Sequence, residues 1–220
     1  MQSSVNKYLS KVYLWMGLGL LISSLFAFFV FISPELQNFI FGNKITFWVL
    51  IIFELGLVFM ISGIIKSISS KTATGLFFLY SALNGLTLSV ILFFYQIYSI
   101  FFVFIIAASM FFAMAIYGMT TKRDLSGWGK LLFGVLIGLV IALFLNMFLK
   151  STAFDFWLAI IGVILFAGLT AYDNQKLIKI FQNVKNKEML NRWTIMGALS
   201  LYLDFVNLFL SLLRLMGETR

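Results

Sequence analysis

Seven long apolar runs dominate the chain, and short polar segments separate them. The runs cover approximately residues 12–32, 45–65, 73–94, 97–119, 131–149, 156–176 and 194–215. Each run is close to the roughly 20 residues that an α-helix needs to cross a bilayer. The sequence therefore predicts an all-α, polytopic protein with seven transmembrane helices in a single membrane domain, residues 1–220. Six helices is the alternative, because the two runs on either side of Gln96 almost fuse.

The composition supports a membrane protein and argues against a nucleic-acid partner. The 220 residues are 62% hydrophobic and 11% charged, whereas a soluble domain carries about 25% charge. The net charge of +8 comes from basic residues in the short loops between apolar runs. That placement is typical of membrane topology, because cytoplasmic loops are enriched in Lys and Arg. We therefore expect the lipid bilayer, and no nucleic acid, as a partner.

The basic residues also predict the orientation of the chain. A cytoplasmic N-terminus places most of the 16 Lys and Arg residues on the cytoplasmic side, namely Lys7, Lys11, Lys66, Lys71, Lys122, Arg123, Lys130, Lys176, Lys179, Lys185, Lys187 and Arg192. Lys44, Lys150 and Arg220 then fall outside, and Arg214 lies near the outer end of the last helix. This asymmetry favours a cytoplasmic N-terminus and an external C-terminus.

The absence of two residue types narrows the chemistry. The chain has no cysteine and no histidine, which excludes disulfides, thiol chemistry and histidine-based catalysis. A bound metal would have to be a hard cation held by oxygen atoms. We expect no enzymatic activity and no cofactor.

Three carboxylates lie inside apolar runs, where carboxylates are costly. Glu54 lies in the second run, Asp173 near the end of the sixth and Asp204 in the middle of the seventh. An ionised carboxylate at the centre of a spanning helix costs about 2.5–3.5 kcal/mol even on the lenient insertion scale. The sequence therefore predicts a buried polar site.

The seventh run carries a polar stripe. Steps of three and four residues put its polar and small residues on one helical face, namely Gly197, Ser200, Asp204, Asn207, Ser211 and Arg214. Such a stripe cannot face lipid and must face other helices or water. A packing seam is the alternative interpretation of the stripe.

The two aspartates lie on consecutive helices, which are usually neighbours in a bundle. Two adjacent carboxylates cannot both ionise cheaply, so they would share a proton and sense pH without histidine. Alone, Asp173 could instead be an interfacial residue near Lys176. Asp204 also lies about 10 Å deeper than Asp173 at 1.5 Å per residue. Pairing therefore requires that the last helix, predicted to begin at residue 194, starts closer to the bilayer interior than this span implies.

The remaining polar positions predict helix contacts. Glu54 should meet a group on another helix, and Arg214 is the cationic candidate. Asn84 could line a cavity or bond a neighbouring helix. A four-residue repeat in the fifth run predicts a seam for close helix packing, formed by Gly134, Gly138, Ala142 and Asn146.

Three segments resemble the transmembrane Bax-inhibitor-motif family, in its bacterial Bax inhibitor-1/YccA-like branch. They are YGMTTKRDLSGWGKLLF at 117–133, GLTAYDNQKL at 168–177 and LSLYLDFVNLFLSLLRLMG at 199–217. The resemblance implies a seven-helix bundle of the bacterial inner membrane with the last helix at its centre. It also implies that Asp173 and Asp204 are the family's paired aspartates near the cytoplasmic side, which form a proton-sensitive gate on a calcium leak.

Three functions follow as hypotheses. The leading one is a pH-sensitive calcium or cation leak, gated by proton sharing between Asp173 and Asp204, which are also the candidate ligands of a transient Ca²⁺. Further residues of its path or polar network would be Glu54, Ser200, Asn207, Ser211 and Arg214. The alternative, which the family resemblance implies, is a non-transporting regulator of a membrane AAA protease. An intramembrane aspartyl protease, which would also use two aspartates on neighbouring helices, is the remote alternative. The sequence argues against it, because Leu203 precedes Asp204 where a Gly-x-Gly-Asp motif would be expected.

Overall fold

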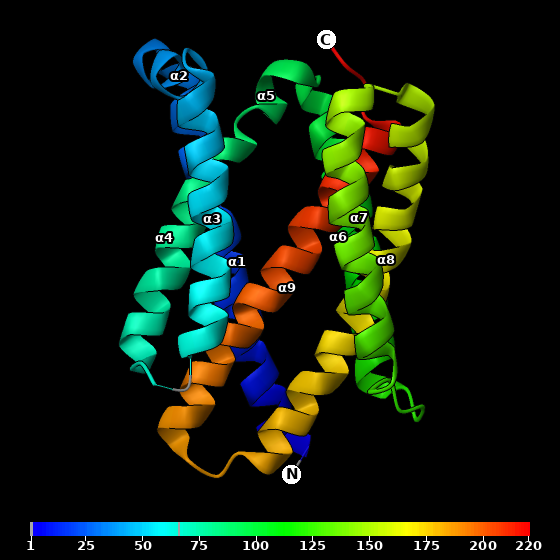
Figure 1. Cartoon of the computed structure of the whole chain (residues 1–220). Coiled ribbons are helices and arrows are strands. Elements are labelled where there is room, and N and C mark those ends of the chain that lie inside the picture. Colours follow the sequence, from blue (N-terminus) through cyan, green and yellow to red (C-terminus); the bar gives the residue numbers. More distant parts are fainter. Residues whose placement is uncertain (1, 66) are drawn as a thin grey trace. The chain divides into compact units, whose positions relative to one another are not determined.

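The computed structural model describes residues 2–65 and 67–220. Lys66, which the charge pattern places on the cytoplasmic side, lies outside the described residues. Over the described residues the chain forms nine helices (Figure 1), namely α1 (Gln2–Ile32), α2 (Pro34–Phe41), α3 (Lys44–Ile64), α4 (Ser70–Leu88), α5 (Ile91–Phe94), α6 (Ile97–Thr120), α7 (Trp128–Leu149), α8 (Thr152–Asn183) and α9 (Lys187–Met216).

Seven segments of the described chain are long and apolar enough to cross a membrane, with α4 and α5 counted as one. This confirms the seven-helix prediction. The runs on either side of Gln96 are separate, because α5 ends at Phe94 and α6 begins at Ile97. The six-helix alternative is therefore wrong.

The helix boundaries differ from the predicted spans in several places, and α1 begins at Gln2, ten residues before its predicted span. A short helix, α2, follows α1; the Ser33 side chain caps it and Pro34 occupies its first turn, as is usual at a helix start. The third run is interrupted between α4 and α5. Helices α8 and α9 extend seven residues beyond the predicted spans toward their connecting loop. The apolar pattern did not predict the added turns of α8 and α9, because it marks only the part of a helix that lies in lipid. Polar residues continue both helices beyond that part.

The last helix is the most buried of the seven spans. In α9, 72% of the most apolar stretch is buried, against 11–33% in the other six. A polar stripe on this helix therefore has protein around it rather than lipid. This burial agrees with the resemblance, which implied a central last helix.

The described chain divides into two compact units. One contains the residues up to Tyr95, Ile180–Tyr202 and Arg220, and the other contains Gln96–Lys179 and Leu203–Thr219. In the first unit α4 packs against both α1 and α3 (Figure 1). In the second unit α8 contacts α6 and α7. The single membrane domain stays a prediction.

Glycines mark the closest helix contacts, but not where the sequence predicted them. A Cβ atom at Gly118 on α6 would overlap the Ala171 carbonyl group on α8. By contrast, Cβ atoms at Gly134 and Gly138 on α7 would meet nothing within 4 Å. The predicted α7 seam is therefore wrong, and Asn146 instead accepts a hydrogen bond from the Ser151 N–H at the end of α7.

Replacement of Gly118 by Ala should destabilise the protein. An Ala normally stabilises a helix relative to Gly, but here its Cβ would overlap the α8 backbone, and overpacking costs about 1–3 kcal/mol. The measurement is thermal unfolding in detergent. Gly134→Ala, which meets open space, is the matched control and should unfold at the same or a higher temperature. Equal behaviour of the two variants would contradict the close α6–α8 contact.

Candidate functional site

The structure brings Asp173 of α8 and Asp204 of α9 within electrostatic range of each other. Both lie in the second unit. Asp204 is only 5% exposed, in the middle of the most buried helix. The side chain of Asp173 is 14% exposed. The predicted pair is therefore a pair of interacting acidic groups, one of them almost fully enclosed.

Lys176 lies beside the two aspartates and forms a charged cluster with them. Its Nζ lies 4.0 Å from Asp173 Oδ1, one helical turn away, and it also interacts electrostatically with Asp204. Lys176 is half exposed. The two interpretations of Asp173, as an interfacial residue near Lys176 and as the partner of Asp204, therefore both describe this cluster. Among the described residues, no group donates a hydrogen bond to the buried Asp204 Oδ2.

The helix boundaries do not explain how the two aspartates come within range. Pairing required the last helix to begin closer to the bilayer interior than predicted, but α9 begins earlier, at Lys187. That requirement is therefore wrong, since Asp204 still lies within electrostatic range of Asp173. Counting residues from the loop assumes straight, parallel helices, whereas spanning helices are tilted by about 20° on average. Residue counts along two tilted helices do not fix the relative depth of their side chains.

The stripe beyond Asp204 behaves largely as a packing seam. The Asn207 side chain donates to the Leu203 carbonyl (2.8 Å), and the Ser211 hydroxyl donates to the Asn207 carbonyl (2.7 Å). A Cβ at Gly162 on α8 would lie 2.5 Å from Ser211 Oγ. These two polar side chains satisfy themselves on their own helix while α8 approaches closely. Ser200, nearer the start of α9, is half-buried.

Arg214 meets an acidic residue other than the expected one. Its Nη1 lies 3.3 Å from Asp155 Oδ1, at the start of α8. Glu54 has partners of its own on α4. The hypothesis that Arg214 pairs with Glu54 is therefore wrong. Asp155 was overlooked because it lies near a loop, yet the start of α8 and the end of α9 meet at the same end of these antiparallel helices.

Glu54 is held by neutral hydrogen-bond donors. It is 7% exposed on α3. The Asn84 side-chain amide donates to Glu54 Oε2 (2.9 Å), and the Thr87 hydroxyl donates to Oε1 (3.0 Å). Both donors lie on α4, so Asn84 bonds a neighbouring helix, which was one of its two predicted roles.

The network continues from Asn84 across two further helices of the first unit. The Tyr202 hydroxyl of α9 donates to Asn84 Oδ1 (2.8 Å) and lies 2.6 Å from the Ser23 hydroxyl of α1. A buried hydrogen-bond network of this kind is worth more than its separate bonds, because each bond polarises the next. Sequence reasoning missed Tyr202 and Ser23, since both fit an apolar packing surface equally well.

A second polar network holds the loop between α6 and α7 against α8. The side-chain amide of Gln175 accepts from Leu125 N–H and donates to the Arg123 carbonyl, both at 2.8 Å. Lys179 Nζ lies 2.5 Å from Asp124 Oδ1. This hydrogen bond lowers the pKa of Asp124 to about 2. The loop is thus fixed to α8 directly beside Asp173.

The acidic pair alone does not form a resident metal centre. Among the described residues, no group of three or more His, Cys, Asp or Glu side chains could hold a metal ion. Two carboxylates supply fewer oxygens than the about six to eight that Ca²⁺ takes.

Comparisons with known proteins identify the family. The family model described as "Inhibitor of apoptosis-promoting Bax1" matches residues 5–220. The chain is 45% identical to the inner membrane protein YbhL of Escherichia coli strain K12, over 100% of this chain and 94% of YbhL. It is 45% identical to an uncharacterized protein of Borreliella burgdorferi, over 98% and 93% of the two chains. It is 41% identical to YrjE of Lactococcus lactis, over 97% and 91%.

These matches extend over almost the whole chain and agree with the seven apolar spans. The protein is therefore a multi-pass protein of the inner membrane. With the family model matched from residue 5 to the last residue, the chain belongs to the Bax inhibitor-1 family of membrane proteins.

Proposed function

We propose that the chain is a pH-sensitive cation leak, best suited to Ca²⁺, and that Asp173 and Asp204 form its gate. The observation that carries the proposal is the buried Asp204 within electrostatic range of Asp173. Two acidic groups in this position cannot both ionise cheaply, and they titrate as one unit. The chain has no histidine, so a carboxylate pair is the available means of sensing pH.

The gate depends on how many protons the pair holds. With one shared proton, the two side chains attract each other and hold α8 and α9 together. Loss of that proton places two negative charges side by side, next to the half-exposed Lys176. A second proton removes the charge that the pair shared. Both changes weaken the link, so the path opens away from the singly protonated state.

The ligand chemistry of the pair favours Ca²⁺ as the cargo. Carboxylate oxygens are hard ligands that Ca²⁺ prefers. The deprotonated pair carries the charge that a divalent cation neutralises. Because the pair offers too few oxygens for a complete Ca²⁺ shell, the ion would retain water and leave readily, as conduction requires.

Replacement of Asp204 by Asn should remove the pH dependence of Ca²⁺ flux. The ratio of the protonated to the deprotonated form of a site changes about tenfold per pH unit, so wild-type flux should vary steeply with pH around the midpoint of the pair. The asparagine side chain cannot share a proton, and the variant's flux should be nearly flat between about pH 5 and pH 8. The measurement is Ca²⁺ flux in proteoliposomes, with Asp173→Asn as a second variant that should behave alike.

Glu35→Gln is the matched control for this experiment. Glu35 is an exposed carboxylate of α2, in the first unit, so the variant removes one negative charge but no contact of the acidic pair, and the pH profile should stay unchanged. An unchanged profile in the Asp204 and Asp173 variants would refute the gate. A wild-type protein without flux that co-purifies with a membrane protease would instead favour the non-transporting regulator.

Replacement of Glu54 by Gln should lower flux at every pH without moving the pH profile. We place Glu54 on the cation path because it is a buried carboxylate whose hydrogen-bond partners Asn84 and Thr87 are neutral. The glutamine side chain keeps the size and most hydrogen bonds but removes the negative charge. The same liposome assay applies, with the exposed Glu35→Gln as control. A shifted profile, or unchanged flux, would remove Glu54 from the path.

A further inference from the structure

A small cavity lies where α3 ends and α9 begins. It has a volume of about 220 Å³ and is lined by Ile65, Asn186, Met189, Arg192 and Trp193. All five residues belong to the first unit. One water molecule in the liquid occupies about 30 Å³, whereas binding sites for drug-sized ligands have volumes of about 300–1,000 Å³. The cavity therefore has room for a small polar group of several heavy atoms.

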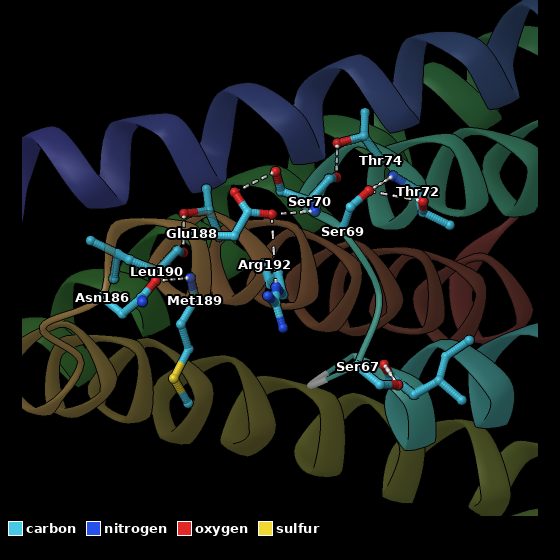
Figure 2. A network of polar contacts seen from close by, with 12 residues as sticks. Ser67, Ser69, Ser70, Thr72, Thr74, Asn186, Glu188, Met189, Leu190 and Arg192 are labelled. Atoms are coloured by element: carbon cyan, nitrogen blue, oxygen red, sulfur yellow. Dashed lines mark hydrogen bonds and ion pairs between the residues drawn. The ribbon is translucent and has the colours of Figure 1, made fainter.

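An ion pair to Glu188, which is itself held by hydrogen bonds, orients Arg192, the cation of this cavity. The Glu188 carboxylate accepts from the Ser70 N–H (2.7 Å) and the Ser70 hydroxyl (3.2 Å), which ties the first turn of α9 to the start of α4. On its other side, Glu188 Oε1 lies 3.8 Å from Arg192 Nε (Figure 2). That distance is too long for a hydrogen bond. Glu188 therefore orients Arg192 by charge while most of its own bonding goes to Ser70.

The polar lining of the cavity favours a ligand with negatively charged oxygens. A guanidinium carries donors and no acceptor. The Asn186 side-chain oxygen accepts from the Met189 N–H (3.0 Å), so the NH₂ of the same amide is what it offers a ligand. Among the five lining residues there is one positive charge and no negative charge. A phosphate group matches this donor set, and Arg binds it in bidentate geometry.

The rest of the lining and its position indicate that the phosphate belongs to a lipid. Ile65, Met189 and Trp193 give the cavity an apolar side. Trp is enriched at the membrane interface, with its ring at headgroup depth. The exposed Lys185 and Lys187 flank the cavity in sequence, on the side that the charge pattern predicts to be cytoplasmic. Basic pockets between spanning helices on that side suit anionic headgroups.

We propose that this cavity, the Arg192 pocket, binds the headgroup phosphate of an anionic phospholipid at the cytoplasmic surface. Arg192 and Asn186 would hold the phosphate oxygens, and Trp193 and Met189 would contact the glycerol and the first acyl carbons. The pocket lies outside the Asp173 and Asp204 cluster and does not depend on the proposed leak. It adds a specific lipid partner to the general bilayer environment.

The test is lipid binding to the purified full-length protein in detergent, followed by native mass spectrometry and thermal unfolding. Phosphatidylglycerol should bind and raise the unfolding temperature, and phosphatidylcholine should do so far less. Arg192→Gln should lower the affinity for phosphatidylglycerol by about tenfold, the loss expected for a charge-assisted hydrogen bond. Lys185→Gln, which removes the same charge beside the pocket, should lower it by at most about fivefold.

A second variant keeps the proposal testable if Arg192→Gln does not fold. Met189→Trp retains every charge but fills the cavity, so its affinity for phosphatidylglycerol should fall to that for phosphatidylcholine. Wild-type affinity in this variant would overturn the pocket, as would equal losses in the Arg192 and Lys185 variants. Inorganic phosphate, titrated alone, separates the two sources of phosphate. Saturation by phosphate with no competition from phosphatidylglycerol would overturn the lipid assignment.

Discussion

The bilayer does not tolerate an unpaired carboxylate, and this constraint governs how the helices of the chain meet. Every acidic side chain within an apolar run must find a partner on another helix, because lipid offers none. The last helix shows the consequence most clearly: it carries Asp204 and the stripe of small and polar residues, and it is the most buried span. Its burial follows from its polarity rather than from its apolar residues, which lipid would have accepted.

The two units satisfy this constraint by different means. In the first unit, Glu54 is held by Asn84 and Thr87, and the Tyr202 hydroxyl supports Asn84 in turn. Those partners are neutral and their hydrogen bonds are mutually consistent, so the arrangement favours one conformation. In the second unit, Asp204 faces another acidic group, Asp173, which is a partner only while a proton is shared. In the proposed function, a partner of that kind makes the contact between α8 and α9 conditional on pH, whereas the Glu54 network does not.

The sequence predicted the number of spans and the buried acidic residues because both follow from the cost of moving groups into lipid. It failed where the outcome depends on three-dimensional packing. The repeat containing Gly134 and Gly138 fits a close helix contact, yet no atom of the described residues would lie within 4 Å of a Cβ at either glycine. Gly118, with no repeat around it, lies against the α8 backbone. Spacing along one helix identifies a face that permits contact, but the neighbouring helix decides whether the contact is made. The Arg214 and Asp155 pair was missed for the same reason.

The contacts around Asp173 constrain the motion that the proposed gate requires. The loop before α7 is fixed to α8 through Gln175 and Lys179, so displacement of Asp173 would break several hydrogen bonds and an ion pair. On α9, by contrast, Asn207 and Ser211 donate to carbonyls of their own helix rather than to α8. The far end of α9 is held again by the Arg214 ion pair. In the proposed gate, α8 is therefore the fixed element, and a displacement of Asp204 is limited in turn by Tyr202, two residues earlier, whose hydroxyl is held by Asn84 and Ser23.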